Sequence, residues 1–113
     1  MNEELGPFQP LWDAWDEAHQ ALLNEPLLHF RRASDAQFDE LEQHLFAKNR
    51  DAAVREAVDM VSVALNVMRW LGCGPNEIAA AARERAEQRI VGQTAEILEK
   101  YSVSRERRPR ASS

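Results

Sequence analysis

The chain has 113 residues, 44% of them hydrophobic, which is enough for one domain with a modest core. Its formal net charge of −5 argues against a protein that coats nucleic acid or an anionic membrane, so we expect no nucleic-acid partner. Cys73 is the only cysteine, which excludes an intrachain disulfide and a thiolate metal cluster built from one chain.

The N-terminal segment MNEELGPFQP is acidic and lacks the basic start and apolar run of a signal peptide. No stretch of the sequence approaches the roughly 20 apolar residues that a membrane span needs. We therefore expect a cytoplasmic location and no membrane partner.

Proline and glycine fall between periodic apolar runs and divide the chain into helical segments. The first predicted helix runs from about Pro10 to Asn24, because proline suits a first helical turn and Pro26 ends the pattern. A loop over residues 29–32 is expected to follow.

A second helix is predicted from Ser34, a candidate N-cap, to about Lys48. Its apolar stripe contains Phe38, Leu41, Leu45 and Phe46.

The third predicted helix begins at Asn49 or Asp51, continues through Trp70, and stops at Gly72 and Gly74. Its apolar residues cover most of the helical circumference at about 100° per residue. Such a helix must be buried on several sides. We therefore expect it to be central to the fold.

Pro75 opens a fourth predicted helix that continues at least to Gln88, and Ile97, Leu98 and Tyr101 indicate that helix resumes. The Arg-rich segment 102–113 is predicted to be a disordered tail. No alternating β-branched run is present, so the fold class is all-α, with one domain over residues 1–101. Oligomerisation is expected to complete a four-helix bundle, because the third helix has so much apolar surface.

Two carboxylates lie on the apolar third helix, where a charged residue is unusual because burial of an unpaired charge is costly. Glu56 and Asp59 are three residues apart and form an ExxD pair on one face. Ser62, Asn66 and Arg55 extend a polar stripe beside Asp59. A ligand can lie along this stripe.

The second helix repeats the arrangement with Asp39 and Glu42. Two helices joined by a short connection pack antiparallel, so the two acidic pairs are expected to face each other. Four desolvated carboxylates need a counter-charge. Mg²⁺ and Mn²⁺ both prefer carboxylate oxygen, and either ion would supply it.

These residues resemble the motif of the MazG-type all-α nucleoside triphosphate pyrophosphohydrolases, in which an acidic pair and a spacer precede ExxD on a long apolar helix. Here thirteen residues separate Glu42 from Glu56. The segment EAVDMVSVALNVMRWLGCGPNEIAAAARERAEQR is similar to the family's ExxD helix, turn and following helix, and the resemblance covers roughly residues 35–90. It implies a MazG-like bundle that forms a homodimer or homotetramer and uses Mg²⁺ to cleave a nucleotide between its α and β phosphates.

The resemblance implies that Asp39, Glu42, Glu56 and Asp59 bind the metal. A second register would align Glu40 and Gln43 with the first pair; we prefer Asp39 and Glu42 because they lie nearer the apolar stripe. Glu40 is a candidate general base, although nothing in the sequence selects it over Glu42.

Arg85 and Arg89 match positions where the family has basic or amide residues that meet phosphates, and Asn66 is a candidate contact to the base or sugar. Which nucleotide is bound is not indicated by the sequence. The alternative function is a non-catalytic helical module for self-assembly or partner binding. In that case Arg50, Arg55 and Arg69 would neutralise the acidic pairs. A nucleic-acid regulator that uses the Arg-rich tail ranks last.

Overall fold

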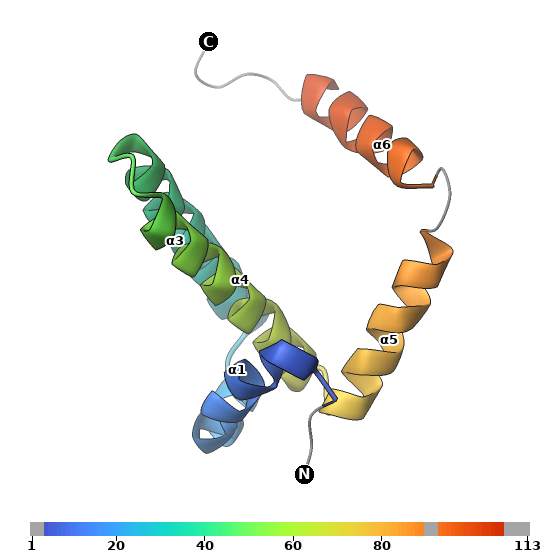
Figure 1. The fold of residues 1–113 in the computed structure, drawn as a ribbon. Helices are drawn as coiled ribbons and strands as arrows, with labels where there is room; N and C mark the ends of the chain where they lie inside the picture. The colour runs from blue at the N-terminus through green and yellow to red at the C-terminus, as the bar shows by residue number, and fades with distance from the viewer. Residues whose placement is uncertain (1–3, 90–92, 108–113) are drawn as a thin grey trace. The chain divides into compact units, whose positions relative to one another are not determined.

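The computed structural model describes residues 4–89 and 93–107, and their regular structure is entirely helical (Figure 1). In chain order the elements are η1 (Gly6–Phe8), α1 (Gln9–Ala14), η2 (Asp16–Ala18), α2 (His19–Leu23), α3 (Leu27–Phe46), α4 (Arg50–Trp70), α5 (Pro75–Gln88) and α6 (Gln93–Arg107). No strand occurs in these two ranges, so the all-α prediction is confirmed for them. None of their helices is long and apolar enough to cross a bilayer.

The chain divides into two compact units, Met1–Ala79 and Ala80–Ser113, whereas the sequence analysis treated residues 1–101 as one domain. The first unit contains the α3–α4 hairpin and the short N-terminal helices. In the second, α6 runs to Arg107, past the Ser102 boundary at which the sequence predicted a disordered tail. The rest of that predicted tail, 108–113, lies outside the described residues.

The N-terminal segment is not the single helix predicted from Pro10 to Asn24. It breaks at Trp15, whose backbone has φ −99° and ψ 2°, and short 3₁₀ turns replace the α-helical pattern there. The tighter turns change the direction of the chain, so that Trp12 before the break and Leu22 after it are both buried. The segment thereby wraps against α4.

Helix α3 begins at Leu27, so the loop expected at residues 29–32 and the N-cap expected at Ser34 are wrong. Pro26 is the N-cap residue, with an extended backbone, and no side chain caps this end. The added turns carry Phe30, which is 3% exposed and packs against the Trp70 ring at 5.8 Å between centroids. Burial of this aromatic ring favours helix in a segment that its polar sequence alone would leave as a loop.

Helices α3 and α4 lie side by side as a hairpin (Figure 1). The connection turns at Lys48, which has the left-handed φ of 59°, and the Asn49 amide donates to the His44 carbonyl oxygen at 2.8 Å. Asn49 also caps α4, since its side-chain oxygen accepts from the Ala52 amide at 3.1 Å. Gly72, with φ 92°, follows the other end of α4. Both predicted ends of this helix are therefore confirmed.

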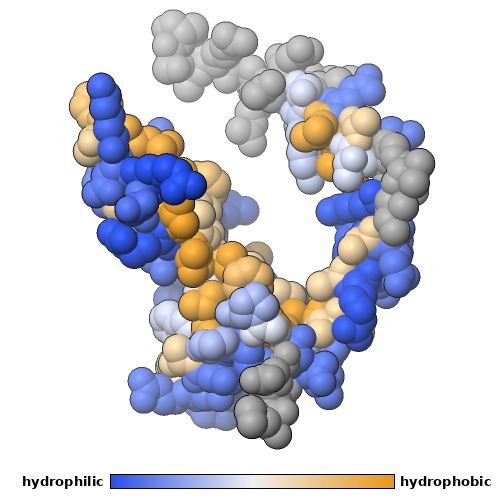
Figure 2. Space-filling model, in the orientation of Figure 1, coloured by the Kyte–Doolittle hydropathy of each residue, from blue (hydrophilic) through white to orange (hydrophobic). Residues whose placement is uncertain are grey.

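The main apolar cluster joins the N-terminal segment, α4 and the start of α5 through the buried side chains of Trp12, Leu65 and Ile78. Helix α4 is less enclosed than expected, because Val54 and Val58 on its outer face are 46% and 38% exposed. Apolar residues reach the surface along the hairpin (Figure 2). Within one chain, α4 is therefore not buried on every side that its sequence would allow.

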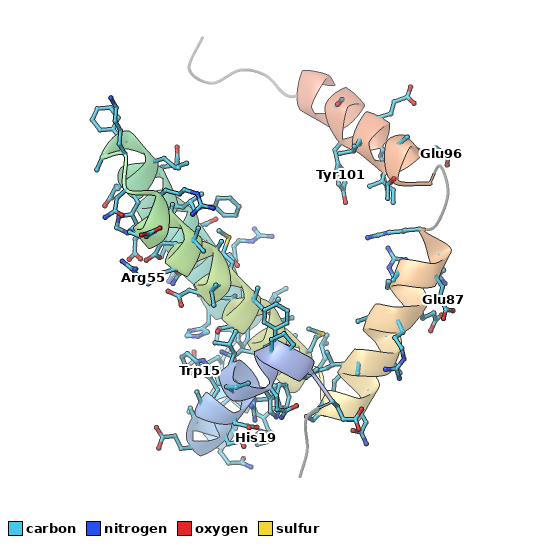
Figure 3. The ribbon with its side chains drawn as sticks, in the orientation of Figure 1. Trp15, His19, Arg55, Glu87, Glu96 and Tyr101 are labelled. Atoms are coloured by element: carbon cyan, nitrogen blue, oxygen red, sulfur yellow. The ribbon has the colours of Figure 1, made fainter. Side chains whose placement is uncertain are left out.

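Arg69 ties the N-terminal segment to α4. Its side chain is 2% exposed, and its guanidinium lies 3.8 Å from the centroid of the Trp12 ring. Nη2 donates to the Trp12 carbonyl oxygen at 2.7 Å, and Nη1 donates to Asp16 Oδ1 at 3.0 Å. Nη1 also lies 3.0 Å from His19 Nδ1, which must accept because a guanidinium only donates. Figure 3 shows Trp15, at the turn between α1 and η2, and His19, at the start of α2, beside α4.

Replacing Arg69 with methionine should lower the free energy of unfolding by about 2–4 kcal/mol, because the buried Trp12 carbonyl and the half-buried His19 imidazole lose their donor. Urea denaturation measures this. Asp16→Asn should cost less than about 1 kcal/mol, since Asp16 is 60% exposed. Arg55→Met, on the exposed hairpin surface, is the matched control; equal losses for the Arg69 and Arg55 variants would contradict the role of Arg69.

Candidate active site

Glu40 on α3 and Glu56 on α4 meet across the hairpin. Glu56 is 13% exposed at its side chain, and the neighbouring Glu40 carboxyl group is the first of the causes that raise its pKa. Asp59, one helical turn further along α4, is close enough to act on Glu56 through its charge. Three carboxyl groups therefore gather on the hairpin. Two of them, Glu56 and Asp59, are the ExxD pair that the sequence predicted.

The pKa of Glu56 is raised above its ordinary value, first by the hydrogen bond to Glu40, then by burial, and then by the charges of Glu40 and Asp59. The opposing influence is His44, whose Nε2 lies 3.7 Å from Glu56 Oε1 and attracts it when protonated. No arginine or lysine is among the groups that shift this pKa. Among the described groups that act on Glu56, none therefore supplies a permanent positive charge.

Asp39 and Glu42, the pair preferred from the sequence, are exposed and are not among the groups that shift the Glu56 pKa. The preference assumed that the apolar stripe of α3 faces α4. Phe38 and Leu45 of that stripe are instead 54% and 58% exposed. The face of α3 that meets the acidic end of α4 carries Glu40, the residue that the sequence proposed as a base.

Gln37 shares this face, because it precedes Glu40 by three residues on the same helix. Its Oε1 atom is buried and has no hydrogen-bond partner. The sequence analysis missed Gln37. The signal that was present is the spacing QxxE, which mirrors ExxD and places an amide oxygen one turn from a carboxylate.

A cavity of about 320 Å³ adjoins the cluster, is partly open to solvent and is lined by the N-terminal segment, α3 and α4. One wall is the predicted polar stripe of α4, formed by Asp59, Ser62 and Asn66. Trp15 and Phe30 add aromatic surface, and Gln37 lines the cavity from α3. Asp59 thus belongs to both the acidic cluster and the cavity, and a ligand held by the cavity would have the carboxylates beside it.

The donor atoms of the cluster suit a hard divalent cation. Carboxylate oxygens are ligands that Mg²⁺ and Mn²⁺ prefer, and Glu56 Oε2 is a buried oxygen without a hydrogen-bond donor. No group of three or more His, Cys, Asp or Glu side chains within 4–89 and 93–107 is already gathered as a metal site. The residues fit such an ion in type, and side-chain rotation would be needed to bring them together.

Arg85 and Arg89, the predicted phosphate contacts, lie in the second unit, and their role stays a prediction. Arg85 donates to Gln88 Oε1 at 3.2 Å. Cys73 shows no sign of an activated thiol, because burial and the nearby Glu77 carboxylate both raise its pKa.

No family model, curated protein or solved structure matches this chain. The MazG-like resemblance remains a prediction.

Glu56 should make stability depend on pH in a defined direction. The folded-state pKa of Glu56 lies above the ordinary value of 4.5. The stabilisation that Glu56 gives to the folded state is therefore present below pH 4.5 and is lost as the pH rises through the folded-state pKa. Glu56→Gln should therefore raise the melting temperature at pH 8 more than at pH 4, without added metal. Thermal unfolding followed by circular dichroism at both pH values measures this.

Glu42→Gln is the control for that experiment, because it removes an exposed carboxylate from the same hairpin. It should change the melting temperature little and by a similar amount at both pH values. A destabilising effect of Glu56→Gln at pH 8 would show that the carboxylate is favourably paired, contrary to the electrostatics described above.

Proposed function

We propose that this protein is a Mg²⁺- or Mn²⁺-dependent nucleotide pyrophosphohydrolase, which converts a nucleoside triphosphate to the monophosphate and pyrophosphate. The observation that supports this most is the group Glu40, Glu56 and Asp59. Among the described residues that act on Glu56 none is a permanent cation, and the three carboxyl groups stand beside a cavity of ligand size. A divalent cation accompanied by a triphosphate would satisfy both features.

The reaction adds water across the anhydride between the α and β phosphates. The water oxygen bonds to the α phosphorus, and the bond from that phosphorus to the bridging oxygen breaks. Pyrophosphate leaves with the bridging oxygen and its electron pair. Glu40 is exposed and lies next to Glu56, so its carboxylate is suited to take the proton from the attacking water. A bound Mg²⁺ or Mn²⁺ ion would supply charge neutralisation of the phosphates and a lowered pKa of water.

Glu56 and Asp59 are proposed to hold the cation, with Asp59 linking it to the cavity. Asn66 lines the same cavity and is 6% exposed, which suits contact with the base or sugar. Asp39 and Glu42 carry no role in this proposal.

A non-catalytic assembly module is the second candidate, and the exposed apolar surface favours it. Phe46 is 92% exposed at the tip of the hairpin, and Phe38, Leu45 and Val54 add to this surface. We propose that it mediates formation of a homodimer or homotetramer, which is compatible with either function. In such a module, Arg50 and Arg69 were expected to neutralise the acidic pairs. They form ion pairs with other residues instead, Arg50 with Asp51 and Arg69 with Asp16. This distribution favours the enzyme.

Pyrophosphate release from ribo- and deoxyribonucleoside triphosphates tests the proposal directly. With Mg²⁺ or Mn²⁺, Glu56→Gln and Asp59→Asn should each lower kcat/KM by about 100-fold or more, because stabilisation of the phosphate charge is worth several kcal/mol. Asp39→Asn and Glu42→Gln should leave it within about threefold of wild type.

Hydrolysis that survives chelation of divalent ions would contradict the proposal. So would equal losses in the Asp39 and Asp59 variants, because the location of the site would then be wrong. An inactive wild-type protein that forms a stable oligomer would favour the assembly module.

A further inference from the structure

The cavity of the first unit has two unlike kinds of wall. Trp15 and Phe30 contribute aromatic surface, whereas Gln37, Ser62 and Asn66 contribute polar groups. Ser62 and Asn66 are buried on α4, at 8% and 6% exposure. Apolar surface with a few polar groups is typical of sites for flat ligands whose edges form hydrogen bonds.

Gln37 Oε1 is the informative atom of this cavity. It is buried and receives no hydrogen bond. A buried acceptor without a donor is destabilising, and native proteins keep such groups rarely. Because the side chain lines a cavity, the missing donor can come from a ligand.

The size of the cavity limits what it can hold. About 320 Å³ lies near the lower end of ligand pockets, which span roughly 300–1,000 Å³. A ring system with a sugar fits this space better than a complete nucleoside triphosphate. Asp59 stands where the cavity meets the acidic cluster, so a charged phosphate chain belongs on the Glu40 and Glu56 side, with its cation.

We propose that this cavity binds the nucleobase of the substrate and that Gln37 is a specificity-determining residue, whose amide oxygen accepts an edge N–H of the base. The base therefore carries a free imide N–H or an exocyclic amine at this edge. Asn66 and Ser62 complete the polar wall. The inference rests on the proposed function in taking the ligand to be a nucleotide.

Nucleosides without phosphates test this inference separately from hydrolysis, in the absence of metal. Binding of uridine, cytidine, adenosine and guanosine to the full chain is measured by NMR chemical-shift titration. At least one should bind and shift the signals of residues 37 and 66. Gln37→Leu should weaken that binding by about tenfold, the value of one hydrogen bond. Gln43→Leu, an exposed change on the same helix, should leave it unaltered.

A modified ligand gives a test that does not depend on a variant's folding. The form of the preferred nucleoside in which methyl groups replace every hydrogen on the edge nitrogen (one methyl at an imide N–H, two at an exocyclic amine) should bind the wild type about tenfold more weakly, and Gln37→Leu should no longer distinguish the two forms. Equal affinity of the wild type for both forms overturns the proposal, as does the absence of binding by all four nucleosides. Nucleoside binding without hydrolysis would instead overturn only the proposed reaction. If the Gln37→Glu variant binds Mn²⁺ more tightly than the wild type and keeps the same base preference, Gln37 belongs to the metal site. That result would overturn its role at the base.

Discussion

The buried guanidinium of Arg69 organises the first unit. A charge at 2% exposure is tolerated because Asp16, the Trp12 carbonyl and His19 all accept from it, and because the Trp12 ring covers it. These partners come from the short N-terminal helices, whereas Arg69 lies near the end of α4. The interaction therefore determines where the N-terminal segment packs. Trp15, which belongs to that segment, then becomes part of the cavity wall.

A second constraint comes from the pairing of α3 with α4. Close packing of two helices brings Glu40 against Glu56, and burial prevents water from fully solvating the Glu56 carboxyl group. The like charges of Glu40 and Glu56 repel each other at this place, whereas the other charged pairs described above are exposed or have opposite charges. Such local conflicts are typical of functional sites, where a ligand completes the electrostatics. The unpartnered oxygen of Gln37 is a conflict of the same kind.

Much of the fold could be predicted from the sequence, because its helix ends are marked by strong local signals. Asn49 caps α4, and Gly72 ends it, through backbone geometry that depends on neighbouring residues alone. The start of α3 could not be predicted in this way, since the turn around Phe30 depends on packing against Trp70. The break at Trp15 likewise follows from wrapping around α4.

The candidate site shows the same division. The ExxD pair was identified because carboxylates on so apolar a helix are unusual. A helical wheel, however, gives only relative directions within one helix and cannot say which face meets a partner. The apolar stripe of α3 was assumed to face inward, yet Phe38 and Leu45 are exposed. That assumption favoured Asp39 and Glu42 over Glu40 and left Gln37 unnoticed.

The proposed metal site on the α3–α4 hairpin is tested most directly by locating the cation. Mn²⁺ added in small amounts to ¹⁵N-labelled protein broadens the backbone signals of residues near its binding site. We expect the signals of Glu40, Glu56 and Asp59 to disappear first, and we expect Glu56→Gln to prevent this loss. Selective loss around Asp39 and Glu42, or weak broadening spread evenly over the acidic surface, would contradict a metal-dependent site on this face of the hairpin.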